Sequence, residues 1–181
     1  EAPVTKLRTS TETNSCGWYR TPTTFTLTAV DTETYAATIY YQLNSGNFLE
    51  YTGPVDLPET YNSLVYYAVD SHGRREADNI ATLLADYEKP VLTYELLGTQ
   101  FDSYWFHSPV TITSEAWDNL TGILYHKIYF APGVYHHFED GPKDFTEQEQ
   151  VDIDLAAYDY ARNSLWTDVR FGIDLEDPKI T

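Results

Sequence analysis

Apolar and polar residues alternate along much of this chain, as they do in a β-strand that is buried on one face. In residues 24–29, Phe25, Leu27 and Ala29 alternate with threonines. Because successive strand side chains point to opposite faces, this period of two predicts a half-buried strand. Strands are also predicted at 39–43, 48–51, 64–69, 80–84, 110–113, 127–130, 135–138, 151–158 and 166–173. The pattern therefore predicts an all-β protein.

Short polar segments between the predicted strands indicate turns. Asn44-Ser45-Gly46-Asn47 separates two strands with residue types that tolerate positive φ, which is typical of a β-hairpin. Gly53-Pro54 and Gly141-Pro142 are expected to interrupt strand pairing, because proline has no N–H group to donate.

The sequence repeats itself with a period of about 87 residues. Pro3, Pro90 and Pro178 are separated by 87 and 88 positions. Spacings of 87 to 89 also relate Trp18 to Trp105, Pro22 to Pro109, Asp31 to Asp118, Gly53 to Gly141, and Asp70 to Asp159. A fixed period of this length indicates tandem copies of one folding unit. We predict domains at 1–87 and 88–175, with 176–181 as the start of a third repeat or a strand-donating tail.

Each predicted domain has the features of an immunoglobulin-like (Ig-like) β-sandwich. Six or seven short strands, with turn signals every 8–12 residues or so, are typical of that fold in a domain of about this length. The predicted fold is therefore two tandem Ig-like β-sandwich domains. The junctions at 86–90 and 174–178 are short and contain proline, so we expect them to restrict the angle between neighbouring domains.

Motifs of the first repeat resemble the Ig-like repeats of large bacterial and archaeal surface proteins, in particular the OmpL-type repeats. The matching segments are Trp18-Tyr-x-x-Pro22, Ile39-Tyr-Tyr-x-Leu-x-x-Gly46, Tyr51-x-Gly-Pro54 and Tyr66-Tyr-Ala-Val-Asp70-x-x-Gly73. The resemblance implies an extracellular module of the kind found in adhesins, stalks and accessory regions of secreted glycosidases. The second copy has no glycine equivalent to Gly73, so we expect its last turn to have a different shape.

Composition and charge limit the partners and the cellular setting that this chain can have. The net charge of −17, from 28 acidic and 11 basic residues, disfavours nucleic acid and anionic membrane surfaces as partners. No stretch approaches the roughly 18 apolar residues of a membrane span, so no membrane insertion is predicted. The single cysteine, Cys16, cannot form an internal disulfide. Because the chain contains no methionine, we expect it to be a processed protein or a piece of a longer one.

The sequence contains no nucleophile elbow, zinc-protease helix, phosphate-binding glycine loop or paired zinc-type cysteines. We therefore predict that the chain is not an enzyme. Calcium is the one cofactor predicted, because it takes oxygen ligands and is often bound between tandem extracellular β-domains. The candidate ligands are Asp86 and Glu88 at the first junction, and Asp31 and Asp118 after the first long strand of each copy. The alternative is that these acids are simply solvated.

Two tryptophans are candidates for ligand binding. Trp105 matches Trp18 in the first copy and is interpreted as a packing residue, whereas Trp117 replaces Val30 and Trp166 has no aligned counterpart. We predict that Trp117 and Trp166 stack on sugar rings, with polysaccharide as the partner. Asn119-Leu-Thr121 is an N-glycosylation sequon, so Asn119 is a predicted modification site.

Two functional hypotheses remain. The first is a non-catalytic structural or adhesive protein of the cell exterior, such as a stalk, surface-layer or filament subunit. Its partners would be other copies or neighbouring Ig-like domains, joined by strand addition through Glu176, Pro178 and Ile180 or through Pro3 and Val4. The alternative is a carbohydrate-binding accessory module of a secreted enzyme.

Overall fold

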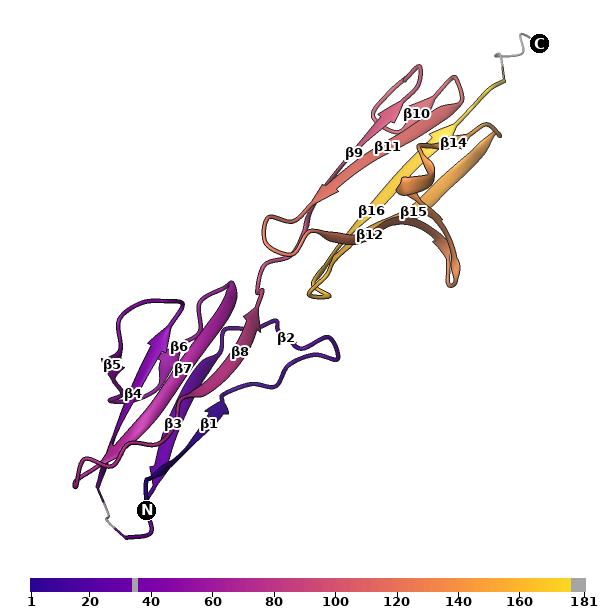
Figure 1. Cartoon of the computed structure of the whole chain (residues 1–181). Helices are drawn as coiled ribbons and strands as arrows, with labels where there is room; N and C mark the ends of the chain where they lie inside the picture. The colour runs from indigo at the N-terminus through magenta and orange to yellow at the C-terminus, as the bar shows by residue number, and fades with distance from the viewer. Residues whose placement is uncertain (34–35, 177–181) are drawn as a thin grey trace. The chain divides into compact units, whose positions relative to one another are not determined.

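The computed structural model describes residues 1–33 and 36–176, and in this part of the chain nearly all regular structure is β-strand (Figure 1). The chain consists of two compact units, Glu1–Glu88 and Lys89–Thr181. Each unit is a sandwich of one three-stranded and one five-stranded sheet.

The first unit contains eight strands among its described residues. Its three-stranded sheet has the order β1 (Val4–Thr9), β3 (Thr24–Val30) and β6 (Val55–Asp56). Its five-stranded sheet has the order β2 (Trp18–Tyr19), β8 (Asn79–Ala85), β7 (Tyr61–Asp70), β4 (Ala37–Leu43) and β5 (Leu49–Glu50). Neighbouring strands are antiparallel except for β2 and β8, which are parallel.

The second unit repeats this order strand for strand. Its three-stranded sheet is β9 (Val91–Leu97), β11 (Val110–Trp117) and β14 (Lys143–Phe145). Its five-stranded sheet is β10 (Trp105–Phe106), β16 (Ser164–Ile173), β15 (Glu149–Asp159), β12 (Ile123–Ala131) and β13 (Val134–His137). A 3₁₀ turn, Phe138–Asp140, follows β13. The identical order confirms the prediction of two Ig-like β-sandwich domains.

Each unit is held together by its own hydrophobic core. Phe25 and Leu27 are buried in the first unit, and Val110 and Ile112 occupy the matching strand of the second. These are the alternate apolar positions from which the strands were predicted. Burial of such a side chain contributes about 1.5–3 kcal/mol, so each sandwich has its own source of stability.

Each Gly-Pro pair lies between strands, as predicted. β5 ends at Glu50 and β6 begins at Val55 in the other sheet, and Pro142 directly precedes β14. The structure corrects the end of one predicted strand. The strand predicted at 135–138 ends at His137, where the 3₁₀ turn begins, and that turn is followed by Gly141 with φ 106°.

Two turns show how local sequence sets the backbone. Asn44 and Ser45 have φ of 52° and 59°, as predicted for the hairpin that joins β4 and β5. The prediction that the last turn of the second unit changes shape is wrong. Arg162 adopts φ 72° where Gly73 has 83°, and both turns keep the same backbone hydrogen bond, 3.0 Å to Asp70 and 3.1 Å to Asp159. The left-handed conformation costs a non-glycine residue about 1–2 kcal/mol.

Candidate functional site

The outer face of the five-stranded sheet in the second unit carries a group of aromatic side chains. Ile128 and Leu155 point into the core, so their strand neighbours Lys127 and Ala156 face outward. The register places Ala156 between Lys127 on β12 and Trp166 on β16. This alternation brings residues from four strands onto one surface, which we call the aromatic face: Tyr125, Tyr129, Tyr135, Tyr158 and Trp166.

Trp166 lies against two tyrosines of this face. Its ring centroid is 5.0 Å from that of Tyr129 at an interplanar angle of 32°, and Tyr158 meets it edge-on at 5.9 Å. Ala156 is buried although it faces outward, because its small side chain lets the flanking rings cover the strand. Trp166 itself remains 46% exposed, so part of its ring is available to a ligand.

A hollow of about 350 Å³ lies beside Trp166. Its lining includes Tyr129, Trp166, Pro132, Gly133, Asp152 and Asp154. It therefore combines ring faces with carboxylates, the two features that a site for a small polar ligand requires. At the edge of the hollow, Asp152 accepts an ion-pair contact from Arg170 Nε at 3.1 Å.

Asp154 and Asp168 stand directly opposite each other on β15 and β16. Hydrogen bonding to Asp168 raises the pKa of Asp154, and burial and the negative charge of Asp168 add to this effect. The two carboxyl groups can therefore accept hydrogen bonds from the hydroxyl groups of a ligand and, when one is protonated, donate one.

Trp117, the other predicted ligand residue, lies apart from the aromatic face. It ends β11, pairs with Val91 and is 44% exposed. It lines a second hollow with His126 and Phe138. Among the described residues Trp117 has no aromatic stacking partner. The structure therefore brings one of the two predicted tryptophans into an aromatic cluster and leaves the other isolated.

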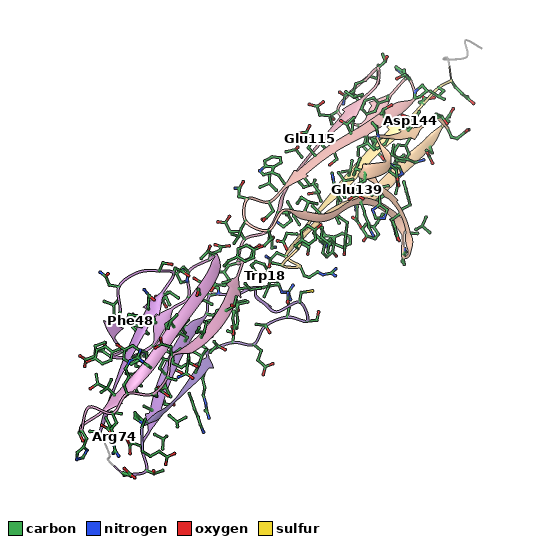
Figure 2. The ribbon with its side chains drawn as sticks, in the orientation of Figure 1. Trp18, Phe48, Arg74, Glu115, Glu139 and Asp144 are labelled. Atoms are coloured by element: carbon green, nitrogen blue, oxygen red, sulfur yellow. The ribbon has the colours of Figure 1, made fainter. Side chains whose placement is uncertain are left out.

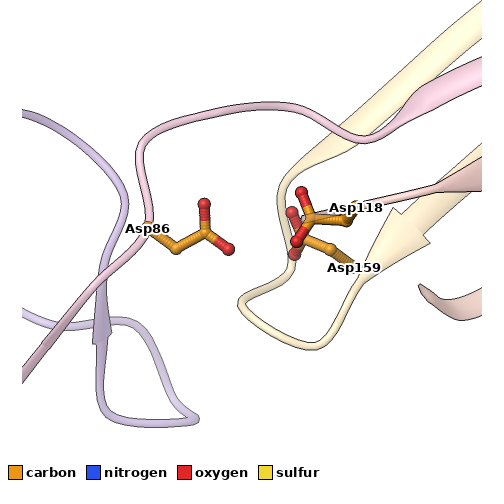
Figure 3. Close-up of side chains that lie close together, drawn as sticks. All are labelled: Asp86, Asp118 and Asp159. Carbon is orange, nitrogen blue, oxygen red and sulfur yellow. The ribbon is translucent and has the colours of Figure 1, made fainter. Parts of the chain in front are cut away.

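Asp118, a predicted calcium ligand, lies in the loop after β11. Its Oδ1 accepts backbone N–H groups from Leu120, Thr121 and Gly122 at 3.0, 2.7 and 3.2 Å. A carboxylate oxygen of Asp159 lies within 4.8 Å of one of Asp118, and Figure 3 shows the two side chains close together. Burial raises the pKa of Asp159, and the charge of Asp118 contributes to the increase.

Sequence reasoning aligned Asp159 with Asp70 but did not assign it a role in binding. A signal was present in the repeat itself. Asp70 is followed four residues later by Arg74, whereas Asp159 is followed at the same distance by Asn163. The loss of a positive charge beside a repeated aspartate marks the position at which the two copies differ chemically.

Asp31, the counterpart of Asp118, lies in a loop that is held by ion pairs. Its Oδ1 accepts the backbone N–H of Glu33 at 2.7 Å. Glu33 in turn contacts the amino group of Glu1 and the guanidinium of Arg74, each at 2.5 Å (Arg74 is labelled in Figure 2). The amino group and Arg74 both lower the pKa of Glu33 by hydrogen bonding and by charge.

The two predicted ligands near the first junction differ in exposure. Asp86 is buried directly after β8, and its backbone N–H donates to the carbonyl of Tyr19 at 3.0 Å. Glu88 is exposed, and its N–H donates to Glu59 at 2.8 Å. Calcium binding by Asp86 and Glu88 stays a prediction.

The predicted assembly residues lie at the two ends of the described chain. Val4 pairs with Val30 in β1 and β3, and Pro3 is buried, so the N-terminal segment is a strand of its own sheet. Glu176 is exposed and its N–H contacts Asp174. Pro178 and Ile180 lie outside the described residues.

The predicted modification site and the cysteine are both at the surface. Asn119 is exposed in the loop after β11, and Cys16 is exposed in the first unit. Glycosylation of Asn119 stays a prediction. None of the described helical residues forms a segment that is long and apolar enough to cross a bilayer.

Comparison with known proteins gives no family. No family model matches the sequence, and no curated protein matches it. Among solved structures, the fibronectin(III)-like modules of Clostridium thermocellum CbhA are similar at 13% identity, covering 98% of this chain and 100% of theirs, with a TM-score of 0.42. The D00-D0 domain of Intimin is similar at 12% identity, covering 93% and 99%, with a TM-score of 0.38. No function is inferred from either likeness.

Proposed function

We propose that this chain is a non-catalytic module of an extracellular surface protein, of the OmpL-type Ig-like kind, and that its second unit binds polysaccharide through the aromatic face. The observation that carries the proposal is the exposed ring of Trp166, which lies against Tyr129 and beside a hollow that Asp154 also lines.

This combination fits a sugar better than other ligands. The apolar face of a pyranose ring stacks on an indole or phenol ring, and its hydroxyl groups need hydrogen-bond partners. Asp154 and Asp168 supply such partners at the edge of the rings. The net charge of −17 repels acidic polymers, so we propose polymers of neutral or amino sugars as the ligands.

The proposal is tested by measuring the affinity of the full chain for a panel of soluble neutral polysaccharides and chitosan. Trp166→Ala is expected to weaken binding by at least about tenfold, by analogy with nucleobases, whose stacking on one aromatic side chain contributes about 1–3 kcal/mol. Trp117→Ala is the matched control, because it removes the same residue type at nearly the same exposure, 44% against 46%.

Two results would contradict polysaccharide binding. One is the absence of binding to every polymer of the panel. The other is equal affinity of the wild-type chain and Trp166→Ala for a polymer that does bind.

The second candidate function is assembly by strand addition, and one feature of the fold favours it. β9 is an edge strand of the three-stranded sheet in the second unit, and Val91, Tyr94 and Leu97 on it are exposed. An edge of this kind can accept a strand from another molecule. Deletion of residues 176–181, the proposed donor, should abolish concentration-dependent polymers in size-exclusion chromatography with light scattering. Polymers that persist in the truncated chain would argue against this mode.

A further inference from the structure

Asp70 and Asp159 occupy the same position in the two units. Asp70 is the last residue of β7 and Asp159 the last residue of β15. In each turn, Oδ1 of the aspartate accepts the backbone N–H of the residue four positions later, at 2.8 Å from Arg74 and from Asn163. The backbone therefore presents both carboxylates in the same way.

The second oxygen of each carboxylate has a different environment. In the first unit, Arg74 Nε donates to Asp70 Oδ2 at 2.6 Å. In the second unit, Asn163 stands in place of Arg74 and carries no charge. Asp159 is 0% exposed, and its Oδ2 has no hydrogen-bond partner among the described residues. A buried carboxylate oxygen without a partner is costly, and native structures rarely leave one unexplained.

A second carboxylate increases this cost. Asp118 and Asp159 bring carboxylate oxygens within 4.8 Å of each other, and Figure 3 shows the two side chains together at the start of their loops. Asp118 cannot easily turn away, since three backbone N–H groups of its own loop donate to its Oδ1.

We propose that a divalent cation, calcium in an extracellular setting, binds the carboxylates of Asp118 and Asp159 in the second unit. Calcium takes six to eight oxygen ligands, and two carboxylates balance its charge while water completes its shell. The cation plays the part that the guanidinium of Arg74 plays in the first unit. This site is separate from the aromatic face and does not depend on polysaccharide binding, although the choice of calcium rests on the extracellular location in the proposed function.

A proton shared by Asp118 and Asp159 is the competing explanation, and calcium titration of the full chain distinguishes the two. After chelation of bound metal, calcium at pH 7.5 is expected to raise the unfolding temperature with a Kd of about 10⁻⁴ to 10⁻³ M, as in other extracellular modules. Isothermal titration calorimetry should give the same Kd.

The variants Asp159→Asn and Asp118→Asn test the assignment. Asparagine keeps an Oδ1 acceptor for the backbone N–H groups but removes the charge, so both chains should fold. Each is expected to weaken calcium binding by at least about tenfold. Asp70→Asn is the matched control, because Arg74 already neutralises that carboxylate, and it should change Kd by less than about twofold.

An independent readout uses terbium in place of calcium. Trp117 precedes Asp118, so its indole is expected to sensitise emission from an ion at this site. Calcium should displace the terbium and so remove its emission. Trp117→Phe should reduce the terbium emission without changing the Kd for calcium.

Two results would overturn the proposal. One is the absence of a calcium response up to 10 mM, a test limit about tenfold above the weakest expected Kd. The other is an unchanged calcium Kd in Asp159→Asn. Magnesium at equal concentration controls for screening of the net charge, and an equal response to both ions, kept in Asp159→Asn, would also overturn it.

Discussion

The two units share one strand order but differ in the environment of their polar residues. In the first unit, charges near the last turn form a network in which Arg74 contacts both Asp70 and Glu33. In the second, Asp159 is buried beside Asp118, and His126 occupies a buried strand position. The residues common to both copies encode the sandwich. The residues that differ are therefore the ones to examine for function.

The aromatic residues show the same contrast. In the first unit, Tyr40 and Tyr67 stack on the outer face at 5.4 Å, and the guanidinium of Arg75 lies over the ring of Tyr67 at 3.6 Å. A cation lies on the second face as well, where Lys127 Nζ is 3.9 Å from the ring centroid of Tyr135. The difference lies at Trp166, whose ring remains partly exposed next to a hollow in the second unit. This tryptophan is what gives the second face the features expected of a ligand site.

The comparison assumes that each unit folds around its own core, and Phe171→Ala tests this with the largest expected effect. Phe171 is fully buried between Phe106 and Phe145. Truncation of such a ring costs about 3–5 kcal/mol. Calorimetry should show a lower unfolding temperature for one transition and no change in the other.

Phe25→Ala is the matched variant, because Phe25 is fully buried in the first unit. Phe25→Ala should lower the unfolding temperature of the transition that Phe171→Ala leaves unchanged. A single transition that moves equally in both variants would contradict independent cores.

The second prediction concerns His126, which stands in the second unit where the first has Ile39. Both residues pair with the equivalent alanines, Ala157 and Ala68. Ser114 Oγ donates to the carbonyl of Thr93 at 2.6 Å and lies 2.8 Å from His126 Nε2. Because the hydroxyl has only one proton, we infer that His126 Nε2–H donates to Ser114.

Burial lowers the pKa of His126 from 6.5 to about 4. The neutral ring is favoured in the folded state, so its contribution is fully present above pH 6.5 and is lost as pH falls toward 4. At about 1.4 kcal/mol per pKa unit, the loss in the free energy of unfolding is at most about 3 to 4 kcal/mol. His126→Ile introduces the residue that the first unit has at this position. In denaturant unfolding, the free energy of unfolding of the second unit should fall less between pH 6.5 and pH 4 in this variant than in the wild-type chain. An identical decline in both chains would assign the pH dependence to other groups.

Gly172 provides a smaller test of the contrast between the two short parallel strand pairs. Trp18 pairs with Leu84, whereas Trp105 pairs with Gly172. A Cβ at Gly172 would overlap the ring of Trp105 inside van der Waals contact. Gly172→Ala should therefore destabilise the second unit by about 1–3 kcal/mol, the usual cost of overpacking.

In a Trp105→Ala background the same substitution should cost much less, because the overlapping ring is absent. Chemical denaturation of the four chains of this double-mutant cycle gives the coupling. Additive effects would show that Trp105 is not the cause.

The fold could be predicted from the sequence because its signals are local and occur twice. Alternating residues such as Phe25 and Leu27 mark a strand, and the repeat confirms each assignment. Trp166 was identified as a ligand candidate because it has no counterpart in the first copy. Its neighbour Tyr129 was not, because the pairing of strands distant in the sequence brings it to Trp166.

The acidic site was half predicted for a similar reason. Asp118 was predicted because it offers oxygen ligands in the loop after the first long strand of the second copy. Asp159 was aligned with Asp70 but its environment depends on what surrounds it in space. The sequence alone does not show that Oδ2 of Asp159 is enclosed near Asp118 or that Arg162 keeps a turn normally made by glycine.

The smallest predicted effect comes from converting the first turn to the charge pattern of the second. Burial acts to raise the pKa of Asp70, but the backbone N–H and guanidinium of Arg74 and the N–H of His72 outweigh it, so this pKa lies below its ordinary value. A lowered pKa means that the stabilisation is present above the unfolded pKa near 4 and is lost as pH falls through the folded value.

Arg74→Asn removes the guanidinium and keeps a backbone N–H at this position. The first transition should therefore become slightly less stable at pH 7 and should depend less on pH below about 4. Because Arg74 is partly exposed, the change at pH 7 should be the smallest of this series. Thermal unfolding at pH 7 and pH 3 measures both effects. If the wild-type chain and Arg74→Asn lose the same stability between these two values, the guanidinium does not set the charge state of Asp70, and the contrast with Asp159 must come from the burial of the two carboxylates instead.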